Sequence, residues 1–549
     1  MDKKKIIAEM LRHCENDKLA APYYINSETY KEPGKIIKPR PVEYYSAGED
    51  IFIVSDLHIA SGRNEAGVYP GTENFFADDS FYRFTLYAER IKKSDKAILI
   101  INGDIFDFLR ITEYPGKIKK AGFTKKFKSL VHFKNLYRHS PPSQDKVNYD
   151  FNEWSGELEK IGIYKSPSEL KDSISGKEKI YGLQTDNYKS VYKLLKIKLG
   201  HPVFIKALKE WIEKGNKLIL LKGNHDLELY WPEVRNYIRL IIAEEIAGAD
   251  KDLEEVLKNT VLRNIYFFDD SLRINKDLYI EHGHRYDKFT IVLDDALLKR
   301  NRSQLNIPFG SFFNRYLLNR VELFYPFLDN VRPSKNVLPM LIKENFPLAL
   351  TVLFKHIPFI LRILATNFRY VKFMFNRVFW FTLAVLSPVI IVVIINPAFI
   401  SDSIKVINKV SNLQGFMNFV FTQAKNLGLL ILPYFLARLV SWLQLEEPSS
   451  LNNYAKIISE NNDYKYIVMG HTHNPGEYLF ENGCRFYNTG TWIPVIENST
   501  ADLREDKTYT FLHFTSDGRE KLIPANESLL VRWNDEAGRA DPQILIQRK

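Results

Sequence analysis

Cysteine is scarce in this chain of 549 residues, since Cys14 and Cys484 are the only two. Two cysteines cannot make a disulfide framework, and the chain has no CxxC pair of the kind that holds zinc. We do not expect a secretory signal peptide in this sequence, because charges interrupt the stretch 6–15 and no small-residue cleavage site follows. A hydrophobic share of 45% excludes intrinsic disorder. We therefore expect a globular protein of a reducing compartment.

The length and the charge are both larger than one ordinary domain requires. Domains usually have about 100–200 residues, so this chain needs several domains or a core with large insertions. Lys and Arg number 76 against 66 Asp and Glu, which gives a net charge of +10. Such an excess predicts an anionic partner: nucleic acid, a membrane surface or a phosphate-bearing substrate.

Short apolar runs recur along the chain, and each ends in a cluster of Asp, His, Asn and Gly. The runs are 51–55, 97–102, 217–222, 278–281 and 466–469. Runs of this length are typical of buried strands, and helical patterns lie between several of them, which predicts the α/β class. Ligands of α/β proteins bind at the carboxyl ends of strands, so we expect the clusters to form one site.

The clusters contain six of the twelve histidines together with carboxylate and amide side chains. They are Asp56-Leu-His58, Gly103-Asp-Ile-Phe-Asp107, Gly223-Asn-His-Asp226, His282-Gly-His284 and Gly470-His-Thr-His473. A lone His or Asp is usually structural, but turn capping does not explain five such clusters at strand ends. Mixed oxygen and imidazole ligands suit Mn, Fe, Zn or Co and argue against a calcium site or a thiolate site.

In type and order these clusters resemble the calcineurin-like metallophosphoesterase family, with its D-x-H, G-D-x-x-D, G-N-H-[DE], later His and G-H-x-H elements. The resemblance implies a four-layer αββα sandwich that binds two divalent metal ions, manganese in the first place, with Fe, Zn, Co or Mg as alternatives. It implies one metal held by Asp56, His58 and His473, a second held by Asn224, His282 and His471, and Asp104 bridging both.

The same resemblance implies the chemistry of phosphate-ester hydrolysis. A hydroxide that bridges the two metals is expected as the nucleophile, since a metal lowers the pKa of bound water. His225 is expected to act as general acid or to stabilise the leaving group, and Asp107 to pair with it. The alternative for Asp107 is a turn-capping role. We expect His284 to lie near the metals without being a ligand.

One branch of the family fits the wider sequence best. Phe108 stands where the protein Ser/Thr phosphatases have an Arg that grips phosphate, although Arg110 follows closely. The stretches 55–58, 103–108, 470–475 and 488–492 resemble the branch that contains UDP-2,3-diacylglucosamine pyrophosphohydrolase.

The spacing of the clusters predicts a core with two insertions. We predict an N-terminal arm at 1–48, formed by a short helix and a Pro-rich segment, and a polar tail at 526–549. The first insertion, 109–200, is rich in Lys and Tyr, and the second, 287–445, is basic and hydrophobic. The core then comprises 49–108, 201–286 and 446–525, with a hairpin around Asn482-Gly483.

The second insertion carries the excess charge of the chain. Residues 285–445 contain 19 Lys and Arg against 7 Asp and Glu. The stretch 378–395 has 18 residues without a charge, and 427–443 is a second apolar stretch. Basic charge mixed with bulky apolar groups is typical of segments attracted to anionic lipid.

The expected metal ligands lie both before and after this insertion and must reach the same metals. The insertion must therefore cross a membrane an even number of times, zero or two. A membrane hairpin of 378–395 and 427–443 satisfies this condition, with the basic flank 332–377 in the cytoplasm. The alternatives are a monotopic cap in the membrane interface and a helical lid folded over the core. We expect the protein at the cytoplasmic face of the cell membrane.

These observations predict a hydrolase: a binuclear-metal phosphoesterase that cleaves a phosphate or pyrophosphate ester. The favoured substrate is lipid-linked and resembles UDP-diacylglucosamine, which connects the enzyme with lipid metabolism. One alternative is a nucleotide or cyclic-nucleotide phosphodiesterase or a nuclease, with the basic groups meeting a polyanion. The other is a non-catalytic scaffold on the same fold.

Overall fold

A computed structural model describes residues 3–12, 17–18, 43–64, 67–115, 144–269, 271–287, 289–292, 295–322, 330–332, 347, 451–497, 502–503, 507–516, 522–525 and 530–543. The chain divides into two compact units. The first comprises Met1–Asn330, Pro448–Ile496 and Leu503–Lys549, and the second comprises Val331–Glu447 and Glu497–Asp502. Few residues of the second unit are described, among them β11 (Val331–Arg332), and the fold below is that of the first unit.

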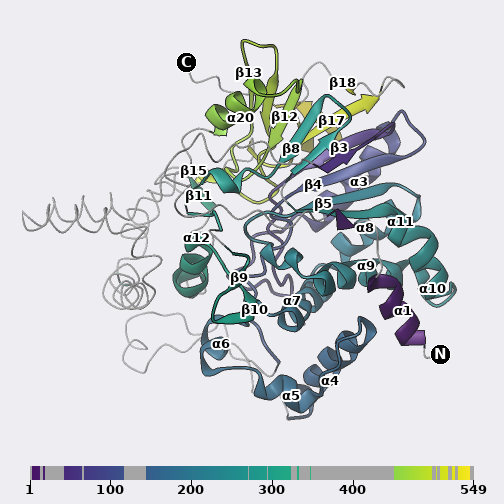
Figure 1. Ribbon diagram of the computed structural model, residues 1–549, viewed down its shortest axis with the longest axis vertical. Coiled ribbons are helices and arrows are strands. Elements are labelled where there is room, and N and C mark those ends of the chain that lie inside the picture. The colour runs from purple at the N-terminus through teal and green to yellow at the C-terminus, as the bar shows by residue number, and fades with distance from the viewer. Residues whose placement is uncertain are drawn as a thin grey trace, which may run out of the picture. The chain divides into compact units, whose positions relative to one another are not determined.

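The larger sheet has nine strands, and a run of neighbouring strands at its centre is parallel. Its order is β1-β6-β5-β4-β3-β17-β19-β20, with β18 paired to β17. The strands are β1 (Asp17–Lys18), β3 (Asp50–Val54), β4 (Ala97–Asn102), β5 (Lys217–Leu221), β6 (Ile265–Phe268), β17 (Thr510–Ser516), β18 (Leu522–Pro524), β19 (Leu530–Asn534) and β20 (Arg539–Pro542). Figure 1 shows β3, β4 and β5 side by side, so their carboxyl ends lie at the same edge.

The smaller sheet has six strands in the order β13-β14-β12-β8-β7-β2. They are β2 (Glu43–Tyr45), β7 (Ser271–Ile274), β8 (Leu278–Glu281), β12 (Tyr466–Met469), β13 (Gly476–Leu479) and β14 (Arg485–Asn488). β12 lies between β8 and β14 and is parallel to both. The carboxyl ends of β8 and β12 therefore also lie at one edge.

Two apolar layers and a helical cover hold the sheets together. Ile51, Ile98 and Ile219 of the larger sheet pack with Leu278 and Ile280 of the smaller one in one buried cluster. The alternate side chains of the larger sheet, such as those of Phe52, Leu99 and Leu218, pack against helices. Strands buried on both faces read as continuous apolar runs, which explains the composition of β3, β4 and β5.

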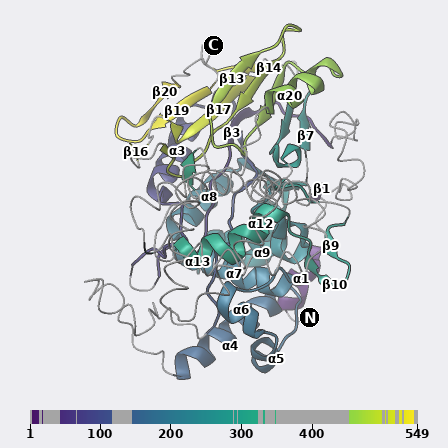
Figure 2. The same cartoon turned by 90° about the vertical axis from the view of Figure 1, so that its left-hand side faces the viewer.

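Helices cover the outer faces of both sheets. The larger sheet is covered by α3 (Asp78–Ile91), α7 (Asn187–Gly200), α8 (Pro202–Glu213) and α9 (Pro232–Ala247), of which α3 and α8 are seen from the side in Figure 2. The smaller sheet packs against α20 (Leu451–Glu460). Further helices of the unit are α1 (Lys3–Arg12), α4 (Gln144–Lys160), α5 (Pro167–Asp172), α6 (Gly176–Tyr181), α10 (Leu253–Val256) and α11 (Leu262–Asn264).

The α/β class predicted from the sequence is confirmed, as are the five strands before the motif clusters. The helix near the N-terminus and the hairpin of β13 and β14 are also present. The predicted tail 526–549 needs correction, because β19 and β20 lie within it and extend the larger sheet. β19 pairs with β17 and β20 pairs with β19, and the local sequence of this short, mixed-polarity stretch does not predict the pairing with β17.

The predicted membrane segments 378–395 and 427–443 lie outside the described residues. Within the described part of the chain, no helix is both long enough and apolar enough to cross a membrane.

Candidate metal centre

All five motif clusters meet at one place, where strands of both sheets end. Asp56 and His58 follow β3, and Asp104 follows β4. The backbone nitrogen of His58 donates to the Asp104 carbonyl oxygen at 2.9 Å. His282 follows β8, and its carbonyl oxygen accepts from the Gly470 nitrogen after β12 at 3.0 Å. Backbone hydrogen bonds between neighbouring loops thus position the side chains.

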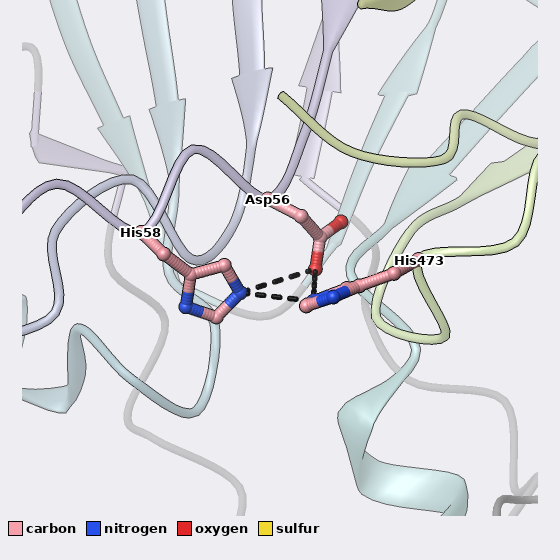
Figure 3. A group of neighbouring side chains, drawn as sticks. All are labelled: Asp56, His58 and His473. Atoms are coloured by element: carbon pink, nitrogen blue, oxygen red, sulfur yellow. Dashed lines mark hydrogen bonds and ion pairs between the residues drawn. The ribbon is translucent and has the colours of Figure 1, made fainter. Parts of the chain in front are cut away.

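Asp56, His58 and His473 form one compact group, the set predicted for the first metal. His58 Nε2 lies 2.9 Å from His473 Nε2 and 3.8 Å from Asp56 Oδ1. His473 Nε2 is 3.3 Å from the same carboxylate oxygen. Figure 3 shows Asp56 and His58 on the loop after β3 and His473 on a second loop, with the three side chains converging. All three are buried, and their ligand atoms lie within 4.8 Å of one another, close enough to hold a metal ion.

Asp104, His282 and His471 form a second such group. His282 Nε2 lies 3.1 Å from Asp104 Oδ2, while His58 Nε2 of the first group lies 3.7 Å from the same oxygen. Asp104 therefore stands between the two groups, in the place expected for a bridging ligand. Asn224 is held nearby, because the next backbone nitrogen, that of His225, donates to Asp104 Oδ1 at 2.8 Å.

Two observations show that the residues present fit a metal ion. His282 Nδ1 donates to the Asn102 carbonyl oxygen at 2.9 Å, so Nε2 is the ring nitrogen directed at Asp104 and the one that could ligate a metal ion. This is the usual arrangement of a metal-ligating histidine. The side-chain oxygen of Asn224 is buried and has no hydrogen-bond partner among the described residues. A buried carbonyl oxygen normally has a partner, and a cation would supply one.

The backbone is strained at the candidate ligands. Among the described residues seven besides glycine have positive φ, and five of them are site residues: Asp56 (54°), His58 (49°), Asp104 (50°), His471 (70°) and His473 (55°). The left-handed conformation costs about 1–2 kcal/mol for a residue with a Cβ. Such strain persists where the surroundings enforce it and is concentrated at functional sites.

Glycines of the motifs leave room for the ligands. A Cβ on Gly103 would lie 2.4 Å from the imidazole of His282. A Cβ on Gly223 would lie 2.1 Å from Asp104 Oδ1, and one on Gly470 would lie 2.4 Å from Asp56 Oδ2. The three loops can approach their carboxylate or imidazole neighbour only because no side chain intervenes.

Asp107 and His225 make the contact that the resemblance implied. His225 Nδ1 donates to Asp107 Oδ2 at 2.8 Å, which leaves Nε2 of His225 for another partner. Burial by itself lowers the pKa of His225, but the carboxylates of Asp107 and Asp104 outweigh it and the pKa lies above its usual value. His58 Nδ1 lies 3.5 Å from the same Asp107 oxygen.

Charges in the site stabilise one another against the cost of burial. Burial raises the pKa of Asp56, but the imidazoles of His282 and His473 outweigh it and hold the pKa well below the usual range. For His282 burial lowers the pKa, and Asp104 and Asp56 raise it to about 9. The carboxylates of Asp107 and Asp56 likewise raise the pKa of His58 to about 10 against the effect of burial. The cluster is therefore built to hold positive charge, as protons or as metal ions.

His284 and Arg110 lie in or near the motif clusters, and the structure shows the surroundings of both. His284 is in none of the three Asp and His groups that could hold a metal ion, and burial lowers the pKa of its imidazole well below the usual value. Arg110 is fully buried and donates to Glu322 at 2.6 Å, so it does not offer a free guanidinium for phosphate.

Two acidic residues of the site had no role assigned from the sequence. Asp226 is fully buried and accepts from the backbone nitrogens of Gly223 at 2.6 Å and Ile105 at 2.8 Å, which joins the loops after β4 and β5. Burial and the charge of Asp104 raise its pKa to about 7. The sequence feature that could have identified Asp226 is its place at the end of the Gly-Asn-His-Asp cluster. Asp287, 3.3 Å from His471 Nε2, stands in no motif.

The segment 488–492 holds the loops of both sheets together. Asn488 Nδ2 donates to the Gly470 carbonyl oxygen at 2.8 Å, and Thr491 Oγ1 donates to that of Asp56 at 2.7 Å. The Trp492 backbone nitrogen donates to the same Asp56 oxygen at 3.1 Å. This segment therefore fixes Asp56 relative to the loop that carries His471 and His473.

Comparisons with known proteins do not assign a family or a function to this chain. No protein-family model matches the chain, and neither a curated protein nor a solved structure matches it.

Proposed function

We propose that this protein is a binuclear-metal phosphoesterase of the calcineurin-like type. The observation that carries the proposal is the meeting of three overlapping Asp and His groups, two of which contain Asp104, with strained backbone at five of the residues. The order of layers, helices on a nine-stranded sheet and a six-stranded sheet under α20, supports the four-layer sandwich of that family. A scaffold without activity has no need for such strain.

Each residue has a role in the proposed reaction. Asp56, His58 and His473 would hold one metal, Asn224, His282 and His471 the other, and Asp104 would contact both. When bound, the two cations would supply a nucleophile from water and offset the negative charge of the phosphate. His225 would donate the proton on Nε2 to the leaving oxygen as the phosphorus–oxygen bond breaks. Asp107 keeps Nδ1 protonated and orients the ring.

For the substrate we propose a lipid-linked phosphate or pyrophosphate ester at the cytoplasmic face of a membrane. The support is the sequence of 285–445, with 19 basic against 7 acidic residues and long apolar stretches. Basic charge beside apolar surface attracts anionic lipid and lipid-linked substrates.

The test is metal content and turnover of the full chain. Asp104→Asn should lose both metal and activity, and His225→Ala should lose activity while it keeps metal. Asp50→Asn is the matched control, because Asp50 is a buried carboxylate paired with His513 at 2.9 Å and lies at the opposite end of β3. Full activity of the Asp104 and His225 variants would refute the proposed mechanism.

A substrate panel separates the alternatives. UDP-diacylglucosamine in mixed micelles, bis(p-nitrophenyl) phosphate and cyclic nucleotides are offered to the manganese-loaded enzyme. Preference for the lipid supports the proposal, and preference for nucleotides without detergent indicates a nucleotide phosphodiesterase. An inactive protein with bound metal would indicate a scaffold.

A further inference from the structure

The start of the second insertion is built into the catalytic unit. The segment consists of α12 (Phe309–Phe313), η6 (Asn314–Leu318) and α13 (Asn319–Glu322), and we call it the α12–α13 segment. Ser311 Oγ donates to the carbonyl oxygen of Asn224 at 3.4 Å. Asn319 Nδ2 donates to the carbonyl oxygen of Leu109 at 2.7 Å. The segment therefore contacts both loops that carry the Asp107–His225 pair.

A buried chain of charges runs from this segment to His225. Glu322 accepts from Arg110 Nη2 at 2.6 Å, and both side chains are completely buried. Arg110 Nε donates to the Thr72 carbonyl oxygen at 2.9 Å and lies 3.9 Å from Asp107 Oδ2. That same Asp107 oxygen accepts from His225 Nδ1 at 2.8 Å.

Arg110 and His225 are thus two cationic donors near the same carboxylate oxygen, Asp107 Oδ2. The guanidinium is directed to Glu322 and Thr72, and it stops short of hydrogen-bonding distance to Asp107. A buried guanidinium that loses its carboxylate partner turns to another acceptor, because an unpaired buried charge is costly. Asp107 is such an acceptor: its Oδ2 lies 3.9 Å from Arg110 Nε, and its Oδ1 has no hydrogen-bond partner among the described residues.

We propose that Glu322 is a positioning residue, which holds the Arg110 guanidinium away from Asp107 so that Asp107 remains the partner of His225. The role rests on the proposed function, since it matters through the proton that His225 donates. It also gives the second insertion a place in the reaction: its first helices set the geometry of the general acid.

Substitutions at this pair separate positioning from simple stability. Glu322→Gln removes the charge and keeps the shape, so Arg110 turns toward Asp107. We expect kcat to fall about 10- to 100-fold, as for other residues that orient an active-site histidine, with KM little changed. Glu322→Asp keeps the charge and should keep kcat. The double variant Arg110→Met with Glu322→Met removes the competing donor together with its partner and should restore most of kcat.

The control is Glu178→Gln, which makes the same change in another buried pair, with Lys189 at 2.6 Å. It should lower stability and leave kcat unchanged. Wild-type kcat in Glu322→Gln overturns the proposal, and so does a double variant as slow as Glu322→Gln. If Glu322→Gln does not fold, the comparison of Glu322→Asp with the double variant decides, and an inactive double variant is the contrary result.

A second measurement does not depend on turnover. In the zinc-loaded full chain with ¹⁵N-labelled histidine rings, the Nδ1 proton of His225 should give a downfield resonance, assigned by its loss in His225→Ala. Glu322→Gln should shift or broaden this resonance, while Glu178→Gln should not. An unchanged resonance overturns the positioning role. Absence of turnover in the wild type, with the resonance shifted as expected, would instead count against the proposed function alone.

Discussion

Gly223→Ala adds one methyl group where the loop after β5 meets the loop after β4. The added Cβ would lie 2.1 Å from Asp104 Oδ1 and 2.5 Å from the Asp104 backbone nitrogen. Cβ atoms in proteins essentially never make contacts below 3.0 Å, so something must shift. A rotamer change of Asp104 does not relieve the overlap, because it leaves the Asp104 backbone nitrogen in place. To reach an ordinary contact of 3.4 Å from 2.1 Å, the carboxylate and the new methyl group must separate by about 1.3 Å.

This displacement acts on the contacts that align the site. It strains two hydrogen bonds: the one from the His225 backbone nitrogen to Asp104 Oδ1, 2.8 Å, and the one from the Gly223 backbone nitrogen to Asp226 Oδ1, 2.6 Å. Overpacking of a buried position lowers the free energy of unfolding by about 1–3 kcal/mol. A misplacement of about 1 Å near reacting groups lowers the rate about 100-fold. We therefore expect Gly223→Ala to fold, with weakened metal binding and about 100-fold lower kcat.

The assay combines thermal unfolding, metal content after gel filtration and turnover. Gly156→Ala is the control: Gly156 lies in α4 and a Cβ there meets no atom within 4 Å. Alanine in a helix interior is favoured over glycine by up to about 1 kcal/mol, so this variant should be as stable as the wild type or more stable. Wild-type metal content and kcat in Gly223→Ala would show that the close approach of the loops is unimportant.

Three further predictions concern other parts of the unit. Carboxylates raise the pKa of His282 from 6.5 to about 9, so the imidazolium stabilises the metal-free protein fully below pH 6.5 and less as the pH rises through about 9. The Tm of EDTA-treated protein should therefore fall across that pH window. Calorimetry should show that metal affinity rises over the same window and that metal binding releases protons. Glu73→Ala removes a carboxylate that accepts from the backbone nitrogens of Ala60, Gly62, Asn74 and Phe75, and it should cost at least about 3 kcal/mol in urea unfolding. Trp533→Ala in β19 should cost about 3–5 kcal/mol, whereas a mobile tail would show no change in Tm.

The sequence by itself determined the strands and the groups that meet at their ends. The apolar runs before Asp56, Asp104 and Asn224 are strands because residues buried on both faces of a sheet leave a continuous apolar signal. These features are local, since the motif and the strand before it are adjacent in the chain.

Only the tertiary structure decided how those groups are held. Asp104 leaves no room for a side chain at Gly223, and Glu322 accepts a hydrogen bond from the Arg110 guanidinium. The two residues of each pair are far apart in the sequence. The positive φ of His58 is likewise enforced by neighbouring loops. Propensity and periodicity describe a residue and its near neighbours, and they carry no information on which distant backbone will approach it.

The same reason explains the correction at the C-terminal end. The sequence of 530–543 is short and mixed in polarity. It forms strands because the edge of β17 pairs with β19, and the free edge of β19 then pairs with β20. Trp533 is buried by residues such as Tyr87 of α3, which lie hundreds of positions earlier. A strand whose stability comes from its partner is determined by the fold, whereas the Asp and His clusters that follow the buried strands are visible in the local sequence.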